Sequence, residues 1–245
     1  MGYRQGKDGF KDDSLRIIKD IERNSAHCQV LLFSATFNDT VKEFVSKVVK
    51  NGNQMFVKKE ELSLDVVKQY KVPCPDELAK IDVIKNKIFE LGEKWGQAMI
   101  FVRTRRSADM LYRELENYGY DCTCIHGAHR QDERDKMVKE FKEGLTKVLI
   151  STDLLACGFD QAQVNLVVSY DLPVKHESSE PDYEPCQTTS HELYQSRAVF
   201  NLLCTEREYA IMEKIENHFN HKAELLKDSK SSEEFELALK KADLL

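Results

Sequence analysis

Apolar runs alternate with helical patterns along most of the chain. Three runs are almost continuously apolar: Ala98–Val102, Val148–Ile150 and Val164–Val168. Strands buried on both faces have this pattern, because neither side of the sheet meets water. The segments between them are about 10 to 15 residues long, with apolar positions at helical spacing. The alternation predicts an α/β fold in which helices cover both faces of a parallel sheet, joined by right-handed crossovers.

The individual elements follow from the same pattern. The expected strands are Val30–Phe33, Gln54–Val57, Val66–Val72, Gln97–Val102, Asp121–Ile125, Lys147–Ser151, Val164–Tyr170 and Ala198–Leu203. The expected helices are Thr40–Lys50, Asp76–Leu91, Ser107–Tyr118, Gln131–Lys142, Glu206–Phe219 and Ser232–Lys241. The helix over Asp76–Leu91 is predicted from an apolar stripe at helical spacing, formed by Leu78, Ile81, Ile84, Ile88 and Leu91. The polar segment Lys58–Leu64 is the best linker candidate, so we predict two parts, residues 1–62 and 63–245.

Charge and composition narrow the classes of function. The 245 residues carry a net charge of −6, whereas a protein held to nucleic acid by charge alone is usually basic. His176–Leu245 has 8 basic and 15 acidic residues (8 − 15 = −7), which leaves +1 for residues 1–175. Any nucleic-acid contact should therefore lie in the first 175 residues and be made by a few placed groups. The acidic tail is either a solvated face or a docking surface for a basic partner.

Cellular location is indicated by cysteine usage and by hydropathy. Seven cysteines with no secretory signal ahead of them are typical of reduced thiols in the cytoplasm or nucleus. No apolar run approaches the roughly 18 residues that a membrane span needs, so we expect no membrane insertion.

Three polar clusters carry the most specific signal. The first is Ser34-Ala35-Thr36, after an expected strand; the second combines Arg103-Thr104 with His126–Arg134; the third is Ser151–Asp160, followed by Tyr170-Asp171. In this order and spacing they resemble the C-terminal half of a DEAD-box ATP-dependent RNA helicase. The segments that resemble its mRNA-export branch, in a plant-like form, are Gly9–Arg16, Gln29–Thr36, Val66–Val72 and Gly158–Gln161.

The resemblance implies a RecA-like fold of the P-loop NTPase type, in which two domains clamp ATP and single-stranded RNA between them. Residues 1–62 would be a remnant of the first RecA-like domain plus a linker. Residues 63–245 would be the helicase C-terminal RecA-like domain. The family role is ATP-dependent remodelling of RNA and RNA–protein complexes in mRNA export.

The resemblance also implies roles for single residues. Ser34, Ala35 and Thr36 would couple the nucleotide to RNA. The residues implied along the RNA backbone are Thr104, Gly127, Gln131, Arg134, Thr152 and Asp153. Gly158 and Asp160 would bind ATP, which the family binds together with Mg²⁺, and Asp160 would accept a hydrogen bond from the ribose of ATP. Weak or absent ATP binding is expected in this chain. Phosphate contacts of this kind are independent of RNA sequence and sensitive to salt.

Four departures from the family pattern argue against catalysis by this chain alone. The sequence contains no Gly-x-x-x-x-Gly-Lys-Ser/Thr phosphate loop and no Asp-Glu-Ala-Asp motif. Cys157 stands where the family has an arginine, and Pro185–Arg197 lacks the glycine and arginine pattern of the family's arginine fingers. Such fingers are worth about 10³- to 10⁵-fold in rate. We therefore expect weak RNA binding without ATP hydrolysis by the chain itself.

Alternative functions remain open on the sequence. The chain could be a non-catalytic partner-docking module, or a degenerate helicase relic. The family's export branch implies an export-factor activator that acts with inositol hexakisphosphate, and a location in cytoplasm and nucleus, including the periphery of the nuclear pore. An active ATPase is a third interpretation, which requires motifs that the sequence lacks.

Two further groups of side chains have competing interpretations. Cys122, Cys124 and His126 alternate, so they share one strand face. A metal site is conceivable, but no second ligand pair follows at finger-like spacing, and buried strand thiols with no structural metal are the favoured interpretation. The basic cluster Arg103, Arg105 and Arg106 fits a surface cluster and an RNA- or partner-facing patch equally well.

Overall fold

The structure is a computed structural model of the chain. It describes residues 11–25, 28–33, 39–49, 52–55, 67–92, 94–152, 163–174 and 196–245. The chain divides into two compact units, Met1–Leu62 and Ser63–Leu245. The interpretation of the first unit as part of a first RecA-like domain stays a prediction.

The first unit contains two helices within its described residues, α1 (Lys11–Asn24) and α2 (Asp39–Val48). The second of these confirms the helix expected over Thr40–Lys50. The strand expected over Val30–Phe33 is wrong: these residues are in no strand, and the Phe33 side chain is 89% exposed. An apolar run becomes a strand only when a neighbouring strand takes up its backbone hydrogen bonds, and the described residues of this unit offer none.

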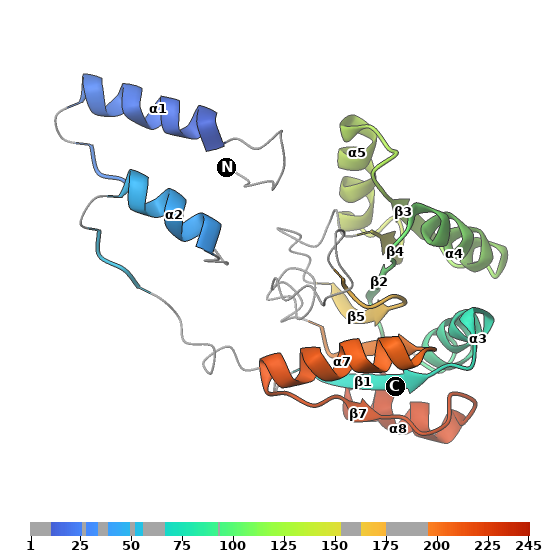
Figure 1. The fold of residues 1–245 in the computed structure, drawn as a ribbon. Coiled ribbons are helices and arrows are strands. Elements are labelled where there is room, and N and C mark those ends of the chain that lie inside the picture. Colours follow the sequence, from blue (N-terminus) through green and yellow to red (C-terminus); the bar gives the residue numbers. More distant parts are fainter. Residues whose placement is uncertain are drawn as a thin grey trace. The chain divides into compact units, whose positions relative to one another are not determined.

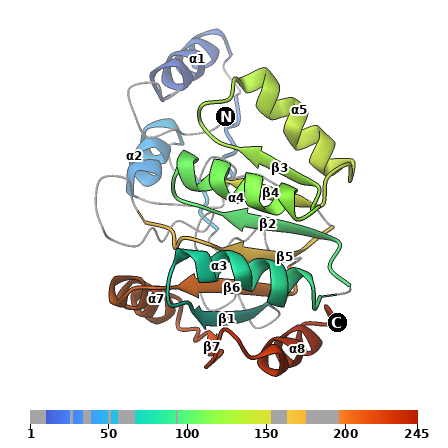
Figure 2. The ribbon, with the colours of Figure 1, turned by 90° about the vertical axis from the view of Figure 1, so that its right-hand side faces the viewer.

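The second unit is built on a seven-stranded sheet in the order β3-β4-β2-β5-β6-β1-β7. Every strand pair in it is parallel. The strands are β1 (Lys68–Pro73), β2 (Gln97–Phe101), β3 (Cys122–Ile125), β4 (Val148–Ser151), β5 (Val164–Ser169), β6 (Ala198–Leu203) and β7 (Glu224–Leu225). Figure 1 shows the sheet nearly edge-on, and Figure 2 shows it face-on with the strands running side by side.

Helices cover both faces of this sheet, as the apolar runs predict. They are α3 (Glu77–Val83), η2 (Ile84–Phe89), α4 (Arg105–Asn117), α5 (Gln131–Lys142), α7 (Glu206–Phe219) and α8 (Ser232–Lys241). Alternate strand residues enter different cores. Ile100 packs in a cluster with α4 residues such as Leu111, whereas Met99 packs with Phe141 of α5. The continuous apolar run is therefore explained by burial on both sides.

The helix expected over Asp76–Leu91 has two parts. It begins as α3 and continues as the π-helical segment η2, where Glu90 N–H donates to the Lys85 carbonyl at 3.0 Å. Ile84 and Ile88 are buried as expected, but Leu78 is 73% exposed and Lys80 is fully buried. The inward face therefore carries a charged group that the apolar stripe does not include.

Candidate nucleic-acid interface

Three neighbouring strands end at the same level, which creates one edge for the candidate site. In the ladder, Ile125 of β3 and Phe101 of β2 both lie opposite Ser151 of β4. Adjacent strands are about 4.8 Å apart, so the ends of β3 and β2 are separated by roughly 10 Å. Thr104, Gly127 and Thr152 follow these strand ends within three residues. Ligands of open parallel sheets bind at this carboxyl edge.

Thr104 begins the helix after β2. Its Oγ1 accepts a hydrogen bond from the Ser107 backbone N–H at 3.0 Å, the N-cap geometry, and lies 2.7 Å from Ser107 Oγ. The side chain is exposed. The cap uses a lone pair of the oxygen, so when Ser107 Oγ–H donates to Thr104 the Thr104 hydroxyl proton is available to an external phosphate oxygen. Helix capping and phosphate binding are therefore compatible at this residue.

Gly127 lies against an arginine that the sequence left undecided. A Cβ placed on Gly127 would be 3.1 Å from a terminal nitrogen of Arg105, so the missing side chain lets that guanidinium lie close to the loop. Arg105 is exposed and has no ion-pair partner among the described residues. One free positive charge thus lies beside the candidate RNA-facing glycine. The sequence placed Arg105 in a cluster but gave no indication of its contact with Gly127.

The first turn of α5 holds the other two candidates on this side. Gln131 Nε2 donates to Asp135 at 2.7 Å, while Glu133 accepts the Arg130 backbone N–H at 2.8 Å and closes the helix start. The Arg134 side chain is half-buried, and its Nε atom is buried with no hydrogen-bond partner. An unsatisfied buried donor costs roughly 1–3 kcal/mol. This cost favours any ligand that brings an acceptor to Arg134.

Thr152 and Asp171 complete the described part of the edge. Thr152 is buried, and its backbone N–H donates to the Ile125 carbonyl at 3.3 Å, which ties the ends of β3 and β4 together. Asp171 follows β5 and accepts the Arg103 backbone N–H at 2.8 Å. Burial raises the pKa of Asp171, although this hydrogen bond opposes the shift. The carboxylate therefore holds the loop that leads into Thr104.

Several predicted site residues lie outside the described residues. They are Ser34, Ala35, Thr36, Asp153, Gly158 and Asp160. Cys157 and residues 185–195 of the altered segment also lie outside them. The structure thus places five of the predicted RNA-facing residues on one sheet edge, and their role in RNA binding stays a prediction.

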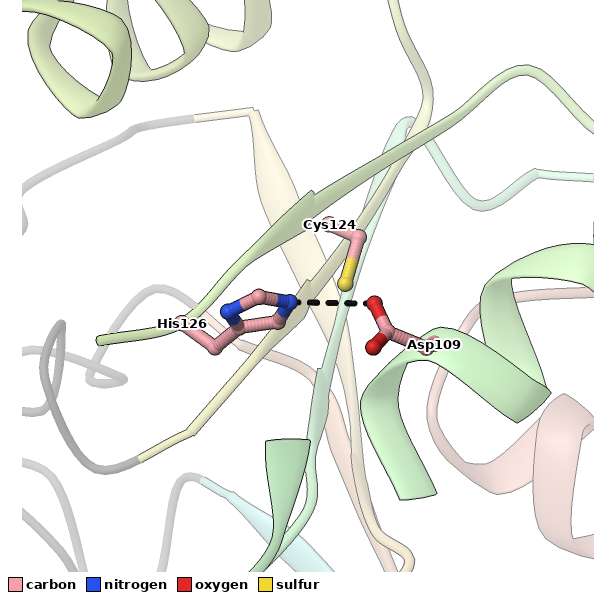
Figure 3. Close-up of side chains that lie close together, drawn as sticks. All are labelled: Asp109, Cys124 and His126. Carbon is pink, nitrogen blue, oxygen red and sulfur yellow. Dashed lines mark hydrogen bonds and ion pairs between the residues drawn. The ribbon is translucent and has the colours of Figure 1, made fainter. Parts of the chain in front are cut away.

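A second group of side chains lies just behind Gly127. His126 is buried, and its Nε2 is 3.0 Å from Asp109 Oδ1 of α4. Its ring stacks on His129, with the two ring centroids 4.1 Å apart. Figure 3 shows the Cys124 thiol directed toward the same His126–Asp109 contact. The sequence pointed to Cys124 and His126, but nothing in it indicated Asp109.

Comparisons with known proteins agree on the family of this domain. Residues 79–198 match the helicase conserved C-terminal domain. The rice (Oryza sativa subsp. japonica) DEAD-box ATP-dependent RNA helicase 38 is 54% identical over 246 residues, which covers 98% of this chain and 48% of the relative. The chain therefore spans about half the length of the curated relatives that it matches.

Solved structures show the same fold. Saccharomyces cerevisiae Dbp5 bound to RNA and ADP BeF3 matches with a TM-score of 0.79 at 30% identity, covering 96% of this chain and 60% of that chain. A Dbp5 variant bound to a Gle1 variant and IP6 matches with a TM-score of 0.80 at 27% identity, covering 96% and 58% of the two chains. Among the described residues, no helix is long and apolar enough to cross a membrane.

Proposed function

Because this chain belongs to the DEAD-box ATP-dependent RNA helicases and carries their helicase conserved C-terminal domain, we propose that it binds the backbone of single-stranded RNA through the carboxyl edge of β2, β3 and β4. Its relatives are of the mRNA-export branch, and the family role is ATP-dependent RNA and RNA–protein remodelling. In this chain the RNA contacts would be made by Thr104, Gly127, Gln131, Arg134 and Thr152, and the family pattern adds Asp153, which lies outside the described residues.

The observation that carries this proposal is the unsatisfied Nε of Arg134. That atom is buried without an acceptor, and the exposed Arg105 guanidinium lies against Gly127, which follows the end of β3. A phosphodiester supplies acceptor oxygens and negative charge to both groups. Because these contacts reach the RNA backbone rather than the bases, affinity should not depend on RNA sequence.

Weak binding is expected because a few placed groups make the contacts. The last 70 residues of the second unit are acidic, so the long-range electrostatic attraction of the unit to RNA is small. Arg130, also near this edge, is already paired with Asp132 at 3.2 Å, which leaves Arg105 and Arg134 as the groups that carry the proposed contact. Binding should therefore fall steeply when one of the free guanidinium groups is removed.

We further propose that the chain does not hydrolyse ATP by itself. Its sequence has no phosphate loop and no Asp-Glu-Ala-Asp carboxylates to hold Mg²⁺. Cys157 cannot supply the charge or the forked donors of the arginine that the family has there. Without these motifs and this arginine, the chain lacks the groups that would hold the phosphates of Mg-ATP. The ribose-binding role of Asp160 is a separate expectation carried over from the family. Ser34, Ala35 and Thr36 would serve coupling only with a complete partner domain.

The test is fluorescence anisotropy of a labelled single-stranded RNA titrated with the full chain at two salt concentrations. Arg134→Ala should weaken binding about tenfold, since a hydrogen bond to a charged group is worth roughly 1.5–3 kcal/mol. The slope of log affinity against log salt should also fall by about 0.7 per lost phosphate contact.

A matched control separates this contact from the general effect of charge. Arg113 lies eight residues after Arg105 on α4, about 12 Å further along the helix from the carboxyl edge, and is exposed. Arg113→Ala removes the same charge and should leave affinity nearly unchanged. Equal binding by wild type and Arg134→Ala would refute the proposed interface.

A second candidate function is a non-catalytic docking module. It is favoured by the matching Dbp5 variant, which is bound to a Gle1 variant and IP6. For this chain the corresponding partner is an export-factor activator that acts with inositol hexakisphosphate, in cytoplasm and nucleus and at the periphery of the nuclear pore. A pull-down with such an activator, with and without inositol hexakisphosphate, should recover the chain; recovery in neither condition refutes the docking role.

A further inference from the structure

Three potential metal ligands meet behind the loop that carries Gly127. Cys124 and His126 are two residues apart around the end of β3, so their side chains lie on the same side of the strand. This is the side that α4 covers, because Cys124 packs on the core cluster that contains Ala108 and Leu111. Asp109 extends from α4 toward both of them (Figure 3). Two neighbouring elements therefore supply a thiol, an imidazole and a carboxylate.

The three ligand atoms converge on one point. The sulfur, the ring nitrogen and the carboxylate oxygen all lie within 4.8 Å of one another, and His126 Nε2 is 3.0 Å from Asp109 Oδ1. In Figure 3 the sulfur and the carboxylate approach the same side of the imidazole. A nucleophile–base–carboxylate relay needs partners at the two different ring nitrogens. The geometry is therefore that of a coordination site rather than of a Cys-His-Asp catalytic group.

The donor set selects the class of cation. Thiolate sulfur, imidazole nitrogen and carboxylate oxygen are the usual zinc ligands, at about 2.3 Å for sulfur and about 2.0–2.2 Å for nitrogen and oxygen. Tetrahedral angles at those bond lengths put neighbouring ligand atoms roughly 3.3–3.7 Å apart. His126 Nε2 and Asp109 Oδ1 are 3.0 Å apart, and all three ligand atoms lie within 4.8 Å of one another, so small side-chain rotations are enough to reach this spacing. We propose that Asp109, Cys124 and His126 bind one Zn²⁺-class divalent cation, with water as the fourth ligand.

Access and protonation are consistent with such a site. The Asp109 side chain is 55% exposed, which gives the cation an entry path, whereas His126 is buried. Without a cation the thiol is neutral, because burial and the nearby Asp109 raise the pKa of Cys124 to about 12. A bound cation reverses this preference, since its own charge is the largest in the site. Binding therefore displaces the Cys124 proton to solvent.

Cation binding also requires the proton of the His126 imidazole to move from one ring nitrogen to the other. In the cation-free arrangement Nδ1 accepts the Ala128 backbone N–H at 3.4 Å, so Nε2 carries the proton and donates it to Asp109. Coordination through Nε2 moves that proton to Nδ1. The long Ala128 contact is lost and the cation–nitrogen bond replaces the hydrogen bond to Asp109. No other reactant is needed for either proton movement.

A cation at this site would affect the loop that follows β3. His126 immediately precedes Gly127, and the loop from there leads into α5 and Arg134. A cation that joins β3 to α4 would fix the start of this loop against the helix that carries Arg105. The cation site can be tested separately from RNA binding, since its three ligands lie outside the set of residues proposed to contact RNA.

The test uses the purified full chain, freed of metal by a chelator and titrated with Co²⁺ as a spectroscopic probe and then with Zn²⁺. One equivalent of Co²⁺ should produce a thiolate-to-cobalt charge-transfer band in the near ultraviolet, and Zn²⁺ should abolish it by displacement. Cys124→Ser should eliminate the band. Asp109→Asn, a change at an exposed side chain that leaves the core intact, should keep the band and weaken Co²⁺ binding at least about tenfold.

The control addresses the other cysteines of the chain. Cys122 is on the same strand face two residues away but is not in the cluster, so Cys122→Ser should retain the full band and affinity. Absence of the band in the wild type overturns the proposal. So does a band of equal intensity in Cys124→Ser, or unchanged affinity in Asp109→Asn, when circular dichroism shows these variants to be folded.

Discussion

Lys80 allows the contribution of a buried ion pair to folding stability to be tested, because its fully buried ammonium holds two elements of the second unit together. Its Nζ donates to the Tyr170 carbonyl at 2.9 Å and to Glu208 Oε1 of α7 at 3.0 Å, and lies 3.3 Å from Glu77 Oε1. The group has 0% exposure. Burial works against the charged form, but the hydrogen bond and charge of Glu208, together with the charge of Glu77, outweigh it, so the pKa of Lys80 is raised.

The perturbation is Lys80→Met, which keeps most of the side-chain volume and removes the charge. It leaves the Tyr170 carbonyl buried without a donor, a loss of about 1–3 kcal/mol. It also leaves Glu208 without its counter-charge, but that carboxylate is 18% exposed and still accepts the Cys204 and Thr205 backbone N–H groups at 2.7 and 2.9 Å. Removing one partner of a fully buried pair costs about 3–5 kcal/mol, so we expect the lower end, about 3 kcal/mol.

The assay is urea unfolding followed by tryptophan fluorescence. Trp95 is the chain's single tryptophan and stacks on Phe89 with ring centroids 4.7 Å apart, so it reports on the second unit. A loss of about 3 kcal/mol corresponds to about 6–12 °C in Tm for a unit of this size. Lys136→Met is the control, because that exposed lysine pairs with Glu140 only at 3.7 Å and should change stability by less than about 0.5 kcal/mol.

Two outcomes would refute the reasoning. If Lys80→Met unfolds within about 1 kcal/mol of the wild type, the ion pair and the Tyr170 hydrogen bond contribute little, and the burial of Lys80 has another cause. If Lys136→Met loses as much as Lys80→Met, the effect comes from total charge rather than from the buried network.

Glu208 and Gly119 provide two further tests, each resting on a single feature of the fold. Glu208 should stabilise the fold in a pH-dependent way: burial favours its neutral form, but the hydrogen bonds from Cys204 and Lys80 outweigh this and lower its pKa below the ordinary value of 4.5. The stability difference between wild type and Glu208→Gln should therefore be complete above about pH 4.5 and disappear as pH falls through the lower folded-state pKa; a difference that is constant with pH in urea unfolding would contradict this. Gly119, after α4, has φ of +86°, and no atom lies within 4 Å of the position that a Cβ would take there. Gly119→Ala should therefore cost about 1 kcal/mol through backbone strain alone, and an unchanged urea midpoint would exclude that strain.

The sequence by itself determined the architecture of the second unit. The helices Gln131–Lys142 and Glu206–Phe219 and the strand Ala198–Leu203 have the predicted bounds. The run Ala98–Val102 indicated a strand buried on both faces, as β2 is. These features are local: helix and strand periodicity are written into neighbouring residues, and two-sided burial appears as an unbroken apolar run. Because β2, β3 and β4 end at the same level, Thr104, Gly127 and Thr152 lie at one edge of the sheet.

Only the tertiary structure decided which distant side chains meet. Lys80 enters the core because Glu208, 128 residues later, lies beside it, and no pattern around either residue signals the pair. Asp109 reaches Cys124 and His126 only through the packing of α4 on β3. Val30–Phe33 has the composition of a strand but forms none in the described part of its unit. Such outcomes depend on strand order and helix docking, which arise from contacts between residues far apart in sequence and therefore leave no local periodicity.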